Sequence, residues 1–215
     1  MNKYIDSFFD EFEAVENQVF PDQQTIKEYS AKLPENLISF WGSYGFCSFL
    51  SGLFWIVNPK QYKGELCEWL DKAGLEGADN YHVIAKSAFG DLFVWKEDYG
   101  LIYEINSMNS WIILQDPPSS DLNKEFNLFL ASLSPDILDV EDESTGEEMH
   151  EQLCEKLGPT SEFEVYSFTP SLVAGGGQNL NSLNKSDLFL YLSLIKDLKS
   201  PSVITEDDLS NMAFS

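Results

Sequence analysis

The chain has 215 residues and a formal net charge of −23, because 36 Asp and Glu residues stand against 13 Lys and Arg residues. A field this negative repels nucleic acid and anionic membrane surfaces, and it accelerates the encounter with a basic partner. With only 2 His and 3 Cys, the chain has few groups for acid–base catalysis or metal binding, so the composition favours a binder of a basic protein over an enzyme.

The N-terminal residues predict a soluble, cytoplasmic protein. A secretory signal needs a basic segment followed by an uninterrupted apolar stretch, but Asp6, Asp10 and Glu13 interrupt the start of this chain. No window approaches the roughly 18 apolar residues of a membrane span. Instead, apolar residues recur on one face of a predicted helix at residues 2–16.

Further elements follow in the first third of the chain. Residues 35–44 repeat the helical spacing of apolar side chains, and residues 53–57 are a short apolar run that predicts a buried strand. The next helix begins at Asn58, which suits an N-cap, has Pro59 in its first turn and ends at Gly74.

Beyond this helix the hydrophobic period falls towards two residues. Four short segments of this kind, separated by turn residues, predict three or four consecutive strands in an antiparallel meander. The segments are 81–88, 91–97, 101–106 and 111–114. After them, apolar residues at helical spacing predict a helix over residues 122–133.

The C-terminal part begins with an acidic stretch. Residues 139–155 hold eight carboxylates and no Lys or Arg, and the second half of the stretch has the apolar spacing of an amphipathic helix. Residues 162–168 alternate like a strand, and residues 185–199 predict a buried helix capped by Asn184. Residues 201–215 are predicted to form an acidic, frayed tail. The whole pattern indicates an α+β fold in which an antiparallel sheet is flanked by helices.

Three motifs resemble ligand sites without completing them. The glycine run at 175–177 lacks the GK[ST] continuation of a phosphate loop, which favours a turn. The segment from Asp139 opens like a calcium loop but lacks the glycine required at the sixth position. The aromatic segment 40–46 has no Lys or Arg nearby for nucleic acid, which favours core packing. No cofactor or metal is expected.

The two histidines give no complete catalytic set. His82 lies in a predicted strand, where a packed core residue is the favoured interpretation. His150 and Cys154 are four residues apart and share a helical face, as a base and a nucleophile would. The surrounding carboxylates raise the pKa of such a thiol, however, and no third group orients the pair.

Two sets of residues resemble a known family. YGF at 44–46, GLFWIVNP at 52–59, EWL at 68–70 and FGDLFVW at 89–95 are similar to the GAD-like domain of bacterial immunity proteins. YSFTPSLVAGG at 166–176, with the predicted helix that follows, resembles the C-terminal domain of the same immunity family. The resemblance implies a GAD-like domain at 1–115, a C-terminal immunity domain at 116–200 and a tail at 201–215.

Members of that family neutralise DNase effectors of the type VI secretion system. The resemblance therefore implies that the chain binds a cognate basic toxin, a nuclease, and occludes or distorts its active site without catalysis. Two alternatives remain open. One is a small hydrolase or ligand-binding enzyme that uses an aromatic cleft around Trp41 and Trp55, and the other is an acidic regulatory or DNA-mimic protein without a toxin partner.

The acidic stretch is the predicted contact surface, and this prediction comes from charge because the resemblance does not cover residues 139–151. A run of charge is often only a solvated face. Since this stretch joins two predicted amphipathic helices, we expect it to be held on a rigid scaffold. The predicted partner-binding residues are Asp139, Glu141, Asp142, Glu143, Glu147 and Glu148.

Overall fold

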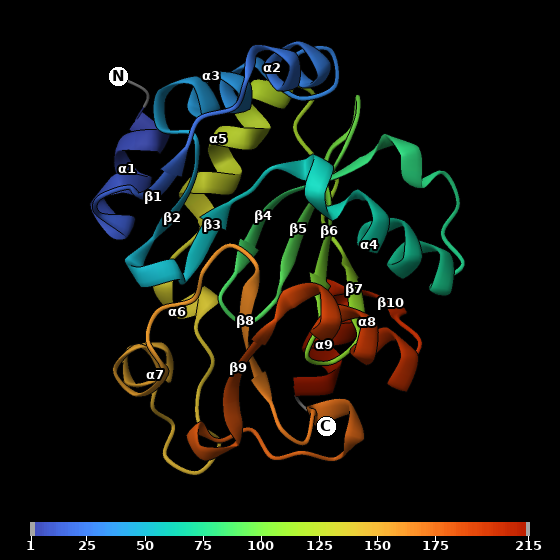
Figure 1. Ribbon diagram of the computed structural model, residues 1–215. Coiled ribbons are helices and arrows are strands. Elements are labelled where there is room, and N and C mark those ends of the chain that lie inside the picture. The colour runs from blue at the N-terminus through green and yellow to red at the C-terminus, as the bar shows by residue number, and fades with distance from the viewer. Residues whose placement is uncertain (1–2, 214–215) are drawn as a thin grey trace.

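The computed structural model describes residues 3–213, and its main element is an eight-stranded sheet in the order β1-β2-β3-β4-β5-β6-β7-β10 (Figure 1). Neighbouring strands pair antiparallel, except β7 and β10, which pair parallel. The strands are β1 (Glu16–Val19), β2 (Phe46–Phe49), β3 (Phe54–Ile56), β4 (Tyr81–Ser87), β5 (Leu92–Lys96), β6 (Gly100–Asn106), β7 (Trp111–Leu114) and β10 (Ser202–Thr205). The predicted α+β fold with a flanked antiparallel sheet is confirmed.

The central strands are buried on both faces of the sheet. Every residue of β4 is buried, and so are the first four residues of β5. Along β5, Phe93 and Trp95 enter one apolar cluster while Leu92 and Val94 enter the other. Successive side chains of a strand point to opposite faces, so two separate cores lie on the two sides of the sheet.

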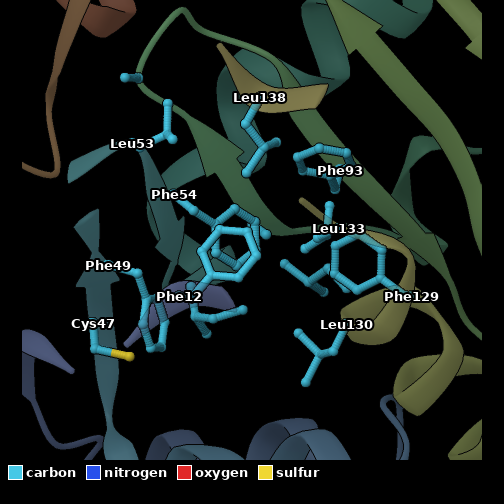
Figure 2. Packing of buried hydrophobic residues seen from close by; sticks show 14 of the residues in the cluster. Phe12, Cys47, Phe49, Leu53, Phe54, Phe93, Phe129, Leu130, Leu133 and Leu138 are labelled. Carbon is cyan, nitrogen blue, oxygen red and sulfur yellow. The ribbon is translucent and has the colours of Figure 1, made fainter. Parts of the chain in front are cut away.

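Three helices cover the first face: α1 (Lys3–Phe12), α3 (Glu35–Tyr44) and α5 (Leu122–Ser132). Their aromatic side chains pack against the sheet, as Figure 2 shows for Phe12 and Phe129 around Phe54. The ring centroids of Phe12 and Phe54 are 5.7 Å apart, and those of Phe93 and Phe129 are 5.3 Å apart. Contacts of this kind add to the stabilisation from buried apolar area.

The second face is covered by α4 (Pro59–Lys72) and α8 (Leu188–Leu198). As predicted, Asn58 caps α4, and its side chain accepts a hydrogen bond from the Lys60 backbone N–H. The two helices are joined by Lys196, whose ammonium lies 2.6 Å from Glu65 Oε1 and 2.9 Å from Glu68 Oε2. Helix α8, more than a hundred residues further along the chain, therefore contacts α4 through ion pairs as well as through apolar side chains.

The remaining elements lie at the ends of the sheet. β8 (Glu164–Phe168) and β9 (Leu183–Asp187) form a separate antiparallel pair. The other helices are α2 (Gln23–Tyr29), α6 (Pro135–Leu138), α7 (His150–Leu157) and α9 (Glu206–Ala213). Short 3₁₀ helices occupy Leu50–Gly52, Ala78–Asn80, Leu172–Ala174 and Leu180–Ser182.

The predicted meander is confirmed in β4 to β7. Two helices elsewhere in the chain have other bounds than the sequence predicted. The helix predicted at 2–16 ends at Phe12, and the chain then forms edge strand β1. The helix predicted at 185–199 begins at Leu188, because residues 183–187 pair with β8. Its cap is Asp187 rather than Asn184, and the Asp187 carboxylate accepts a hydrogen bond from the Leu190 backbone N–H.

The prediction of a frayed tail was also wrong for the described residues. Residues 202–205 form β10, which extends the main sheet beside β7 in continuous register. The backbone N–H of Ser202 donates to Ser110 O at 3.0 Å, and Glu206–Ala213 continues as α9. A stretch predicted to be outside both domains therefore completes the sheet of the first one.

The predicted domain boundary at 115/116 stays a prediction, but packing crosses it. Helix α5 follows that boundary and packs against α1, α3 and β6, all of which precede it. The first core therefore includes side chains from both predicted domains, among them Phe126 and Leu130.

Candidate partner-binding surface

The acidic stretch folds into a β-hairpin, which we call the acidic hairpin (residues 139–149). Glu141 and Glu148 form an antiparallel bridge, and Asp142 N–H donates to Glu147 O at 2.8 Å. At the turn, Gly146 has a φ of 71° and its N–H donates to Asp142 O at 2.7 Å. Glycine adopts this left-handed backbone without the steric cost of a Cβ. The stretch is thus an ordered hairpin held by its own backbone hydrogen bonds.

Asp139 and Asp142, two of the six predicted contact residues, point into the structure. Asp139 Oδ1 accepts backbone hydrogen bonds from Val140 at 2.7 Å, His150 at 3.0 Å and Met149 at 3.2 Å, which anchors the start of α7. Burial raises the pKa of Asp139 to about 6, although these three donors oppose the shift.

Asp142 fastens the hairpin to the rest of the C-terminal region. Its carboxylate accepts from the backbone N–H groups of Ser144 and Leu180, both at 2.8 Å. Hydrogen bonds from Ser144 and Leu180 lower the pKa of the Asp142 carboxyl. Both aspartates therefore serve the hairpin's own structure, which the charge pattern alone did not predict.

The other four predicted residues, Glu141, Glu143, Glu147 and Glu148, are exposed. Gln178 fixes the backbone of the first two: its Nε2 donates to Glu141 O, and its backbone carbonyl accepts from Glu143 N–H, both at 3.0 Å. Among the described residues, no Lys forms an ion pair with any of these four side chains. The structure thus presents four unneutralised carboxylates on a fixed backbone.

A second surface feature, which the sequence did not predict, lies along edge strand β1. We call it the β1 groove, and it consists of two cavities of about 380 Å³ and about 230 Å³ that share Val19 and Glu162. The residues that define it are Glu16, Val19, Phe20, Ser51, Trp55 and Glu162. They come from three distant segments of the chain, so no local pattern announces the groove.

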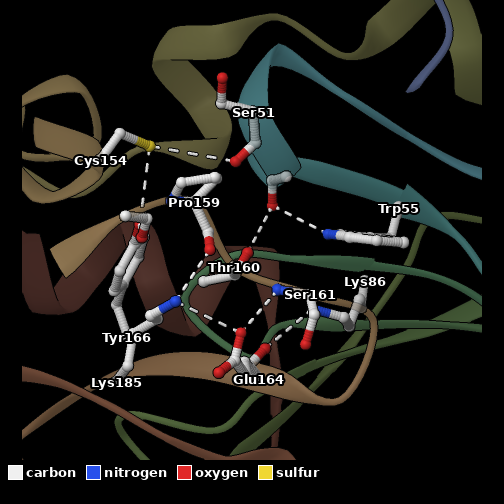
Figure 3. A network of polar contacts seen from close by, with 12 residues as sticks. Ser51, Trp55, Lys86, Cys154, Pro159, Thr160, Ser161, Glu164, Tyr166 and Lys185 are labelled. Atoms are coloured by element: carbon white, nitrogen blue, oxygen red, sulfur yellow. Dashed lines mark hydrogen bonds and ion pairs between the residues drawn. The ribbon is translucent and has the colours of Figure 1, made fainter. Parts of the chain in front are cut away.

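Hydrogen bonds fix the walls of the β1 groove (Figure 3). Gly52 O accepts from Trp55 Nε1 at 3.1 Å and from Thr160 Oγ1 at 3.0 Å. Nearby, Cys154 Sγ of α7 lies 3.9 Å from Ser51 O. The acidic hairpin leads directly into α7, so α7 links the two surface features.

The side chains of His150 and Cys154 lie in contact, as their spacing of four residues suggested. Cys154 Sγ lies 3.5 Å from His150 Nε2 and 3.5 Å from the Tyr166 hydroxyl. Burial raises the pKa of Cys154 and lowers the pKa of His150 to about 4. At neutral pH the pair is therefore an uncharged thiol and an uncharged imidazole, whereas a reactive cysteine needs its thiolate form.

The aromatic segment 40–46 packs in the core, as predicted. Phe40, Trp41 and Phe46 are buried, and Trp41 has no exposed area. His82 is also a core residue, with Nε2 at 2.8 Å from Glu97 Oε1. An aromatic cleft around Trp41 and Trp55 is absent from the described residues, because the first is enclosed and only the second lines a groove.

The glycine run at 175–177 is a turn, as predicted. It follows a 3₁₀ helix at Leu172–Ala174, and Gly175 has a φ of 85°. A Cβ on Gly176 would lie 1.9 Å from Pro170 O, so a close backbone approach requires glycine there. Within residues 3–213, no cluster of three His, Cys, Asp or Glu side chains has metal-binding geometry, and no helix is long and apolar enough to cross a membrane.

Comparison with known proteins assigns most of the chain to two families. Residues 3–109 match the GAD-like domain, and residues 123–199 match the C-terminal domain of the T6SS immunity protein Tdi1. The crystal structure of Atu4351 from Agrobacterium tumefaciens shares the fold with a TM-score of 0.82 at 20% identity, over 93% of this chain and 91% of that one. No curated protein matches the chain. Residues 3–109 therefore belong to the GAD-like family, and residues 123–199 belong to the family of the C-terminal domain of the T6SS immunity protein Tdi1.

Proposed function

We propose that the protein binds and neutralises a cognate toxin, a basic nuclease, in the cytoplasm and without catalysis. The observation that carries this proposal is the acidic hairpin. It presents Glu141, Glu143, Glu147 and Glu148 exposed on a hydrogen-bonded backbone, without an ion pair to any described residue. An immunity role of the family agrees with it.

The chemistry of a nuclease explains why such a hairpin would inhibit it. A nuclease holds the phosphates of its substrate with basic side chains. Carboxylates fixed on a rigid hairpin carry the same negative charge as those phosphates, so they would bind the same basic side chains and occlude the active site. The net charge of −23 also steers a basic partner towards the protein and speeds association.

Co-expression tests this function. The candidate toxin is the product of the neighbouring gene, which is expressed alone, with the parent protein, or with a variant in which the four exposed glutamates are changed to Gln. We expect the parent to restore growth, to co-elute with the toxin from a sizing column and to stop DNA degradation by the purified toxin.

A matched control removes the same amount of charge elsewhere. It carries Asp10→Asn, Glu11→Gln, Asp71→Asn and Glu76→Gln, all at exposed positions. The hairpin variant should protect poorly while this control protects like the parent. Growth arrest that persists with the parent, and no complex on the column, would refute the proposed function. Equal loss in both variants would show that net charge acts and the hairpin does not.

A further inference from the structure

The β1 groove lies at the open edge of the main sheet. Within the described part of the chain, β1 is the end strand and pairs with β2 alone, with an irregularity between Glu16 and Val19. Next to the cavities, Val19 and Phe20 each expose 60% of their surface. Exposed apolar side chains beside an edge strand are typical of surfaces that receive an extended segment of another protein.

The charge of the groove indicates what that segment carries. Glu16 and Glu162 both line the larger cavity, and no Lys is among the described residues that line either cavity. Burial raises the pKa of Glu162, whereas the charge of the buried Lys86 nearby acts to lower it. A cation entering beside it would gain from both carboxylates.

Trp55 supplies an apolar wall of the groove. Only 5% of its surface is exposed, and its indole N–H donates to Gly52 O. The Lys86 ammonium already lies 5.4 Å from the Trp55 ring centroid, as cations are attracted to tryptophan faces. The attraction for a basic side chain in the groove therefore comes from the two carboxylates.

The walls are also held before any partner arrives. Ser51 N–H donates to Glu16 Oε2 at 3.1 Å, and Ser161 N–H donates to Glu164 Oε2 at 2.9 Å. Glu16, Ser51 and Trp55 come from the GAD-like domain, whereas residues 159–162 come from the C-terminal domain. A segment bound here would therefore contact both domains at once.

We propose that the β1 groove is a second contact surface for the toxin, and this inference rests on the proposed function. An extended toxin segment lies along β1, with a Lys or Arg side chain between Glu16 and Glu162 and apolar neighbours against Val19 and Phe20. The acidic hairpin and the β1 groove, joined through α7, then hold the toxin at two places.

Photo-crosslinking locates the segment. Benzoylphenylalanine is placed at position 20, and in a separate protein at position 190, where Leu190 is 72% exposed on α8. After irradiation with the toxin identified by co-expression, we expect a crosslink from position 20 to a toxin peptide that contains Lys or Arg. Position 190 serves as the exposed control, and no crosslink is expected from it.

Binding kinetics test the charge. Glu162→Gln removes one carboxylate, and Val19→Arg fills the groove with a competing cation from an exposed position. Each should raise the Kd for the toxin by about 10-fold or more, mainly through faster dissociation, while Glu76→Gln leaves it unchanged. Melting temperatures confirm that the variants are folded, and Val19→Arg stands on its own if Glu162→Gln is unstable.

The outcomes separate the inference from the proposed function. If the parent binds the toxin but the groove variants bind equally well and position 20 does not crosslink, the inference is wrong and the function stands. A crosslink from position 190 alone also overturns it. If the parent forms no complex with the toxin, both are overturned.

Discussion

Replacing Lys86 with Met should stabilise the protein at neutral pH. Lys86 has no exposed area, and burial lowers the pKa of its ammonium to about 7 against the opposing charges of Glu162 and Glu164. Its Nζ donates to Glu164 O at 3.1 Å. Met has a similar unbranched shape but no charge to bury, so Lys86→Met removes the cost and keeps most of the packing.

The magnitude follows from the two pKa values. The unfolded chain holds a proton on Lys86 up to its ordinary pKa of 10.5, whereas the folded chain releases it above about 7. Each unit of difference between the two pKa values corresponds to 1.36 kcal/mol. At pH 7 the buried Lys86 therefore lowers the free energy of unfolding by about 4 kcal/mol. Loss of the bond to Glu164 O and of the Trp55 contact offsets about 1–2 kcal/mol. We expect a net gain of about 2 kcal/mol in the free energy of unfolding.

The two pKa values also fix how the free energy of unfolding changes with pH. Because only the unfolded chain binds this proton between pH 7 and 10.5, the parent becomes more stable as the pH rises through that window. Lys86→Met lacks this gain, so its advantage over the parent should shrink by up to about 1.4 kcal/mol per pH unit above pH 7.

Urea unfolding at pH 6, 7, 8 and 9 measures both effects, with Lys27→Met as a control at an exposed lysine of α2. Taking the difference between variant and parent cancels every other titrating group. Parallel stability profiles for Lys86→Met and the parent would refute the reasoning, and so would a variant less stable than the parent at pH 7.

Three further outcomes are expected. Lys196→Met should lower the free energy of unfolding by about 3 kcal/mol, because it leaves the Glu65 carboxylate unpaired between α4 and α8. In urea unfolding, adding Glu65→Leu should recover part of that stability, and no recovery would contradict a charge-based cause. Asp139→Ala should cost about 1 kcal/mol by removing the acceptor for the backbone N–H groups at the start of α7, while Asp139→Asn keeps most of the stability. Equal melting temperatures for the two variants would argue against this role of the carboxylate. Stopped-flow association with the toxin should lose much of its salt dependence when the four exposed hairpin glutamates become Gln; an unchanged salt slope would place the steering charges elsewhere.

The elements that the sequence predicted correctly are those fixed by local patterns. The β4 to β7 meander shows period-two alternation with turns between strands, and α4 has both a cap at Asn58 and a proline in its first turn. Both signals act within a few residues, so they are present in the sequence whatever the rest of the chain does.

The elements that were missed depend on distant partners. β10 has four residues and gains its place only by pairing with β7, some ninety residues earlier. β9 reads Leu-Asn-Lys-Ser-Asp and has no apolar alternation, yet it pairs along its whole length with β8. Sheet pairing supplies hydrogen bonds irrespective of side-chain type, so short or polar strands leave no hydrophobic period to detect.

The predicted contact surface stays a prediction, but the structure shows how its six side chains lie. Charge identified residues 139–148, and four of the six side chains are exposed. That Asp142 turns inward had a local signal, because Asp two residues before Ser144 is a common side-chain-to-backbone turn. That Asp139 reaches His150 N–H, eleven residues away, had none. The β1 groove requires segments 16–20, 51–55 and 159–162 to meet, which only the fold brings about.

The distribution of lysines explains why so much acidity reaches the surface. All 13 cationic residues are lysines, and several are used inside the structure. Lys86 and Lys196 are buried, and Lys185 donates to Pro159 O and Glu164 within the C-terminal domain. Cations held in internal contacts cannot neutralise carboxylates on the exposed hairpin. The negative field that a basic toxin meets therefore results from where the lysines are placed as well as from how few there are, and moving a lysine onto the hairpin should weaken that field more than the change in net charge alone would indicate.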